Sequence, residues 1–101
     1  MEIEYKKDVT ILTFTEQRIA DEEQIRDLQE SLEPVIEKNQ DNKLIFNFVN
    51  VKLITSLLLD LLIMVHKRIC QLGGQIQVSN LDSNLRRVFE TTQLTEVFDI
   101  S

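Results

Sequence analysis

The segment from Val51 to Gly74, VKLITSLLLDLLIMVHKRICQLGG, constrains the fold more than any other part of the chain. Its apolar run and its closing pair of glycines predict one helix, with Ser56 in the first turn and a C-terminal stop. At about 100° per residue, the apolar side chains of this helix cover an arc of roughly 200°. An arc this wide can be buried against a sheet and a neighbouring helix together. The rest of the chain must therefore supply both.

A hairpin and a helix are predicted before this segment. Alternation of apolar and polar residues predicts two paired strands, from Glu2 to Tyr5 and from Val9 to Thr15. An acidic cluster then indicates a helix N-terminus that Asp21 can cap, because carboxylates complement the positive end of the helix dipole. The apolar residues of this helix recur at helical spacing and form one buried stripe: Ile25, Leu28, Leu32 and Val35 or Ile36.

Two more strands and a third helix are predicted around the apolar helix. A turn at NQDNK (39–43) leads into LIFNFVNV (44–51), which is apolar on both faces, as a central strand is. After the apolar helix, QIQVSN (75–80) alternates as a strand, and Asp82 or Ser83 caps a helix over residues 84–92. The tail LTEVFDIS (94–101) predicts a turn and a short strand.

The order of these elements predicts an α/β fold. We expect a four- to five-stranded mixed sheet with an N-terminal β-hairpin and about three α-helices. Helices that join successive strands place those strands largely parallel. A chain of 101 residues is long enough for one core, so residues 1–101 are expected to form a single domain.

Charge and cysteine content exclude several classes of protein. The formal net charge is −6, whereas direct nucleic acid binding needs clustered Lys and Arg residues. The single cysteine, Cys70, cannot form an internal disulfide and favours a reducing compartment. No signal-peptide pattern is present, and Asp60 interrupts an apolar run that is shorter than the roughly 20 residues needed to cross a bilayer. We expect a cytoplasmic protein that does not enter a membrane.

No pattern for catalysis is present. The sequence has no glycine-rich phosphate loop, paired-carboxylate motif or Ser/His/Asp signature, and no Cys/His cluster at metal-ligand spacing. We therefore expect no catalytic residue, no metal site, no cofactor and no enzyme activity. His66 and Cys70 both fall in the apolar arc, where a half-buried core histidine and a small buried thiol are the expected roles.

Three apolar residues of the helix deviate from its angular pattern. Leu57 and Met64 lie one heptad apart inside the polar arc, and Leu61 lies at its boundary. A group of apolar side chains on a polar face indicates a docking edge for a partner. The alternative, surface leucines without a function, is equally common.

Several segments of the chain carry a family pattern: RIADEEQI (18–25), LGG (72–74), LRRVFETTQL (85–94) and Phe98 with Ile100. In this order and spacing they resemble the STAS domain of bacterial anti-sigma factor antagonists. The resemblance covers nearly the whole chain and implies a STAS-like fold, in agreement with the predicted α/β order.

The resemblance implies a function and a site. Such antagonists bind an anti-sigma factor with serine-kinase activity and release a sigma factor; phosphorylation of a serine switches binding off, and a PP2C-type phosphatase restores it. Ser56 stands at the phosphoacceptor position. Thr55 replaces the family's aspartate, Leu57 replaces a serine or threonine, and Leu58 replaces a glycine. The expected partner-binding residues are Thr55, Ser56, Leu57, Leu61 and Met64.

Three alternatives remain open at this point. The weakest is that the domain binds a nucleotide or other small ligand, although the sequence supplies no phosphate loop. Ser56 can be an unmodified N-cap, which is worth roughly 1 kcal/mol to its helix. The domain can also be a STAS interaction module that binds a partner, or a second copy of itself, without phosphorylation. Either a monomer or a weak homodimer is compatible with the sequence.

Overall fold

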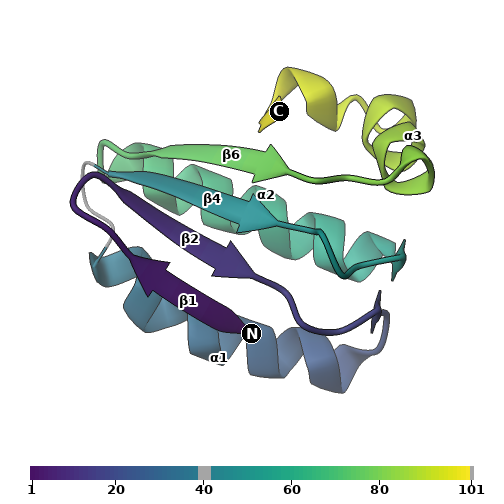
Figure 1. The fold of residues 1–101 in the computed structure, drawn as a ribbon, viewed down its shortest axis with the longest axis horizontal. Coiled ribbons are helices and arrows are strands. Elements are labelled where there is room, and N and C mark those ends of the chain that lie inside the picture. Colours follow the sequence, from purple (N-terminus) through teal and green to yellow (C-terminus); the bar gives the residue numbers. More distant parts are fainter. Residues whose placement is uncertain (39–41, 101) are drawn as a thin grey trace.

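The computed structural model describes residues 1–38 and 42–100, which form a mixed sheet with two helices packed on one face (Figure 1). The strands are β1 (Glu2–Tyr5), β2 (Val9–Thr13), β3 (Arg18–Ile19), β4 (Lys43–Asn47), β5 (Leu53–Ile54), β6 (Gln75–Ser79) and β7 (Asp99–Ile100). The helices are α1 (Glu22–Lys38), α2 (Ser56–Gln71), α3 (Ser83–Thr91) and the 3-10 helix η1 (Leu94–Glu96). Most of the predicted turn at 39–43 lies outside the described residues, as does Ser101.

The main sheet has the strand order β1-β2-β4-β6-β7. Strand β1 is antiparallel to β2, and the pairs β2–β4, β4–β6 and β6–β7 are parallel. This confirms the predicted hairpin, the central position of β4 and the mixed sheet with three α-helices. A second sheet, the parallel pair β3–β5, was not predicted from the sequence.

Strand β4 is shorter than predicted because a turn follows it at once. The Asn47 side-chain oxygen accepts a hydrogen bond from the Val49 N–H at 3.1 Å, and the Val51 N–H donates to the Phe48 carbonyl at 3.0 Å. Asparagine commonly forms such local turns, which compete with strand pairing. The predicted strand over residues 44–51 therefore ends at Asn47, and the chain is free to enter β5.

A cluster of phenylalanine side chains lies within the leucine-rich core. Phe14, the residue after β2, stacks on Phe46 of the adjacent strand β4, with ring centroids 5.8 Å apart. Phe48 contacts both Phe14, at 5.0 Å, and Phe89 of α3, at 6.1 Å. All four rings are fully buried. The aromatic cluster thus connects the sheet to α3, which lies beyond the end of β6 in Figure 1.

Capping groups define where the helices begin and end. The Asp21 carboxylate accepts from the Gln24 N–H at 2.8 Å, while the Gln24 side chain accepts from the Asp21 N–H at 3.2 Å. This reciprocal pair is a capping box at the start of α1. Asp82 caps α3 by accepting from the Leu85 N–H at 2.8 Å. At the end of α2, Gly73 adopts a positive φ of 82°, the conformation that glycine allows at a helix C-terminus.

The structure corrects the predicted burial of Cys70 on α2. Cys70 is exposed rather than buried. It lies about 100° around the helix from the buried Ile69, outside the sector that the sheet and α1 cover. His66 is half-buried, as predicted, with its ring edge-on to Phe98 at 5.3 Å and its Nε2 atom 3.6 Å from the Cys70 sulfur.

Replacing Phe46 with alanine should lower the free energy of unfolding by about 3–5 kcal/mol, because the central strand would lose a stacked ring and leave a cavity. Urea denaturation followed by circular dichroism measures this loss. The matched control is Val49→Ala, which truncates an exposed side chain and should change the free energy by less than about 0.5 kcal/mol. Similar losses in both variants would contradict this assignment of the core.

Candidate functional site

The N-terminus of α2 is not capped by the Ser56 side chain. Thr55, in an extended conformation, occupies the N-cap position, and Ser56 is the first helical residue. The Thr55 side chain does not cap the helix; its hydroxyl donates to the Ala20 carbonyl at 3.3 Å. The interpretation of Ser56 as the N-cap is therefore wrong. Ser56 is exposed, and none of the described residues forms a hydrogen bond with its hydroxyl group.

The β3–β5 pair places the starts of α1 and α2 side by side. Arg18 pairs with Leu53 and Ile19 with Ile54 in parallel register. Each helix begins a few residues after its strand, so both N-termini lie at the end of the molecule where the parallel strands finish (Figure 1). Thr55 strengthens this arrangement through its bond to Ala20. Two segments far apart in the sequence thus form one surface around Ser56.

The electrostatic surroundings of Ser56 suit an anion. The first turn of a helix leaves amide groups without intrahelical acceptors, and the helix dipole is positive at this end. The first turn of α2 contains no acidic residue, whereas Glu22 and Glu23 begin α1. Exposed basic side chains, Arg18 and Lys52, lie on or next to the β3–β5 pair. A phosphate on Ser56 would therefore meet the N–H donors at the start of α2.

Exposed apolar side chains gather at the same end of the molecule. Val49, Leu53 and Leu57 are 51%, 44% and 37% exposed. They come from the loop after β4, from β5 and from the first turn of α2. Sequence reasoning identified Leu57 but missed the other two, although the exposed Leu53 beside the buried Ile54 is an alternation that could have indicated it. These three residues form what we call the apolar patch.

The predicted docking residues lie together between α1 and α2. Leu57 is exposed, Met64 is half-buried and Leu61 is buried. They line a shallow groove of about 270 Å³ with three further residues: Ile25, Gln29 and Asp60. We call this the α1–α2 groove. It begins one residue after Ser56, so the groove and the phosphoacceptor candidate share the start of α2.

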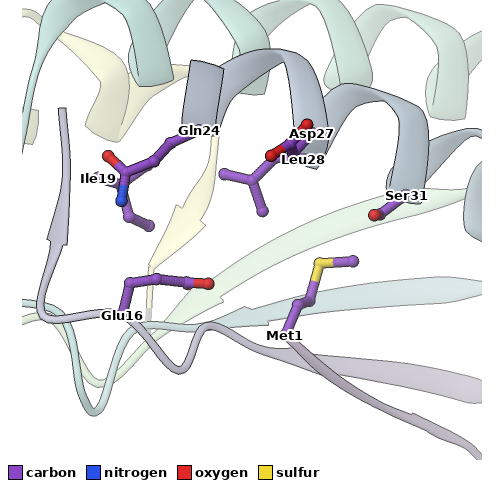
Figure 2. A pocket seen from close by; sticks show the side chains of 7 residues that line it. All are labelled: Met1, Glu16, Ile19, Gln24, Asp27, Leu28 and Ser31. Carbon is purple, nitrogen blue, oxygen red and sulfur yellow. The ribbon is translucent and has the colours of Figure 1, made fainter. Parts of the chain in front are cut away.

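A second pocket, of about 170 Å³, lies between α1 and the segment that leads to β3 (Figure 2). Met1, Ile19 and Leu28 supply apolar atoms, and Glu16 and Asp27 supply carboxylates. One Glu16 oxygen is buried without a hydrogen-bond partner among the described residues. Within residues 1–38 and 42–100, no group of three or more His, Cys, Asp or Glu residues could hold a metal ion. Among the same residues, no helix has the length and apolar character to cross a membrane.

Solved structures with the same fold are found in several bacteria. A STAS domain protein of Planctomyces limnophilus, described as an anti-sigma-factor antagonist, has a TM-score of 0.88 at 20% identity, covering 98% of this chain and 86% of its own. A candidate anti-sigma factor antagonist of Thermotoga maritima has a TM-score of 0.84 at 19% identity, with coverages of 98% and 83%. The phosphorylated form of SpoIIAA, a Bacillus cell fate determinant, has a TM-score of 0.73 at 13% identity, with coverages of 99% and 89%.

These identities are low, so the three structures establish a shared fold. A search among curated protein sequences found no significant match. The sequence model of the STAS domain, in contrast, matches residues 1–101. The five-stranded mixed sheet with its three α-helices agrees with that match. The chain therefore belongs to the STAS domain family.

Proposed function

We propose that this protein is an anti-sigma factor antagonist that binds an anti-sigma factor of the serine-kinase type and so releases a sigma factor. It acts in the cytoplasm by binding, without catalysis or a cofactor, as a monomer or weak homodimer. The single observation that carries the proposal is the exposed Ser56 at the first position of α2. It supports the proposal because SpoIIAA, a protein of the same fold, has a phosphorylated form.

Ser56 is a better phosphoacceptor than its neighbour Thr55. The Thr55 hydroxyl is half-buried and donates to the Ala20 carbonyl, so phosphorylating it would break the link between β5 and the start of α1. The Ser56 hydroxyl is exposed and makes no hydrogen bond to the described residues. A kinase could therefore modify Ser56 without disturbing the fold.

Phosphorylation of Ser56 would oppose partner binding through desolvation. A phosphoserine carries a charge of about −1.5 to −2 at pH 7. In the free protein the phosphate is stabilised by the N-terminus of α2 and by water. In a complex it would lie beside Leu53 and Leu57 of the apolar patch, where a partner surface excludes water. Burying a charge there without a new counterion is costly, so the complex dissociates.

The departures from the family pattern make the site around Ser56 more apolar and less acidic. Leu58, at the family's glycine position, is fully buried and belongs to the core. Leu57, at a serine or threonine position, adds apolar surface directly beside Ser56. Thr55, at the aspartate position, removes a negative charge and uses its hydroxyl to fix the neighbouring segment. The partner surface should therefore be more apolar than one that faces an aspartate and a serine.

Incubation with the cognate anti-sigma kinase and ATP should add the mass of one phosphate to the protein. Intact-mass spectrometry should show that Ser56→Ala loses this addition and that Thr55→Val keeps it. The controls are needed because the two hydroxyls are adjacent. If Ser56→Ala still gains a phosphate, the modified residue is a different one and the proposed switch at Ser56 is contradicted.

Replacing Ser56 with aspartate should weaken binding to the anti-sigma factor by more than about tenfold, because a charge must then be buried at the interface. The same change should stabilise the free protein by about 0.5 kcal/mol through the dipole of α2. Isothermal titration calorimetry and thermal unfolding measure the two effects. Ser83→Asp is the matched control, since Ser83 is the exposed first residue of α3. Equal losses of affinity in both variants would point to a non-specific charge effect.

The second candidate function is a STAS interaction module that binds its partner without phosphorylation. The α1–α2 groove favours it, because Leu61 and Met64 offer apolar surface that does not depend on the state of Ser56. In that case the chain would bind through the side of α2, and Ser56 would be only a neighbour of the contact.

The double change Leu57→Gln with Met64→Gln should reduce binding to the anti-sigma factor by about tenfold or more under either function, because apolar contact area is lost. Both side chains are at least partly exposed, so the thermal transition should stay within a few degrees. Val97→Gln, which alters another exposed apolar residue, is the control and should bind normally. Unchanged affinity of the double variant would remove both residues from the interface.

A further inference from the structure

The α1–α2 groove opens directly onto the core. Its floor is Leu61, which is 5% exposed, and its walls include Ile25 and Met64. These two wall residues are partly buried and pack against the hydrophobic core. Leu57 stands exposed where the groove meets the start of α2. A side chain that enters the groove would therefore contact apolar atoms on three sides.

An ion pair between the two helices closes the other end of the groove. The Arg68 Nη1 atom donates to both carboxylate oxygens of Glu33, at 2.7 and 2.8 Å. This hydrogen bonding to Glu33 raises the pKa of the Arg68 guanidinium above its ordinary value. Arg68 follows Met64 by one helical turn, and Glu33 follows Gln29 by one turn. The pair holds the helices together just beyond the groove, so the groove exists before any partner arrives.

The charge on the wall of the groove selects a cation. Asp60 is the one charged residue among the six that line it, and it is exposed without an ion-pair partner among the described residues. Glu22, also exposed, lies one turn before Ile25 on α1. Arg26 lies about 100° around α1 from Ile25 and so points away from the floor. With a net charge of −6, the whole chain attracts cationic partners.

The same charges disfavour a second copy of the chain as the occupant. The groove lining of a second copy contains no cationic residue that could pair with Asp60 in a two-fold dimer through this groove. Two chains of net charge −6 also repel each other. The observations therefore favour a different protein, one that is basic where it meets Asp60.

The walls of the groove favour a helix over an extended segment. An extended segment needs backbone donors and acceptors from its receptor, but α1 and α2 use their own backbone groups internally. Gln29 is the only neutral polar side chain among the six residues that line the groove. A helix satisfies its own backbone and presents apolar side chains at spacings of three, four or seven residues. The distance along α2 from Leu57 to Met64 is about 10 Å, or two helical turns, which matches that spacing.

We propose that the α1–α2 groove binds one amphipathic helix of the partner protein, with an apolar side chain seated over Leu61 and a lysine or arginine beside Asp60. The proposal rests on the proposed function in that α2 is the docking element. It adds the class of structure that binds there, extends the site onto Ile25 and Gln29 of α1, and assigns Asp60 as the residue that selects a cation.

The test uses synthetic helices as probes of the full chain. One probe is an amphipathic peptide of about 18 residues with a leucine face and lysines elsewhere, and the other carries glutamate in place of each lysine. Methyl-resolved NMR of the labelled protein should show that the lysine peptide shifts the methyl groups of Ile25, Leu57, Leu61 and Met64. The glutamate peptide should bind at least about tenfold more weakly. Shifts located on the open face of the sheet, or equal binding of both peptides, would overturn the proposal.

Matched variants test the two proposed contacts, which are the cation beside Asp60 and the apolar side chain over Leu61. Asp60→Asn should weaken the lysine peptide about threefold, as expected for an exposed ion pair, and Met64→Gln about tenfold. Glu30→Gln removes another exposed carboxylate and Val97→Gln another exposed apolar side chain, both outside the groove lining, and each should change affinity by less than about twofold. If the control variants weaken binding as much as the groove variants, binding is general and the groove is not its site.

Failure of this inference can be told apart from failure of the proposed function. Ser56→Asp should leave binding of the lysine peptide unchanged or slightly tighter, because it adds negative charge near the groove without blocking it. If the protein is phosphorylated on Ser56 but does not bind the lysine peptide, the proposed function stands and the inference about the groove is wrong. If the protein binds the lysine peptide but is not phosphorylated on Ser56, the inference about the groove stands and the proposed phosphorylation switch is wrong.

Discussion

The packing of α2 against both the sheet and its neighbour α1 (Figure 1) is the constraint on which the rest of the structure depends. Leu58, Leu62, Val65 and Ile69 are fully buried, and Leu61 is nearly so because α1 packs beside it. A helix with so wide an apolar surface is stable only when two other elements cover it. The sheet, through β6, provides one surface and α1 the other. Because α2 is held on two sides, its first turn and its outer face have fixed positions.

The fixed position of α2 explains how one helix can carry two adjacent features that we propose for recognition. Its N-terminus is tied to α1 through the β3–β5 pair and the Thr55 hydroxyl, which leaves Ser56 exposed. Its outer edge is tied to α1 through Arg68 and Glu33, which keeps the groove open between the two contacts. The groove and the exposed hydroxyl are therefore consequences of the same packing between helices, and neither requires a loop to become ordered on binding.

Much of the fold follows from the sequence because local patterns and packing agree. The hairpin, the central strand, the capping residue Asp82 and the apolar stripe of α1 all have period or capping signals that the structure confirms. The β3–β5 pair could not be predicted, since strands of two residues have no measurable period. Cys70 was misplaced because an angular arc predicts which side of a helix is apolar, but not how much of that side the neighbours cover. The groove depends on how α1 and α2 pack, which the pattern of either helix alone does not determine.

The charges around α2 limit how a phosphate on Ser56 could switch binding. Ser56 lies one turn before Asp60, about 6 Å along the axis, which is within a Debye length of roughly 8 Å at physiological ionic strength. A phosphate would therefore add to the negative potential at the groove, and this would attract a cationic helix more strongly, not less. Repulsion at long range cannot be the cause of release. On the proposed function, the loss of affinity would come from contact with the apolar patch, where Leu57 and Leu53 make the removal of water from a phosphate costly. On the proposed function, the apolar residues beside the serine would thus be part of the switch, because they would turn an added charge into a penalty paid only in the complex.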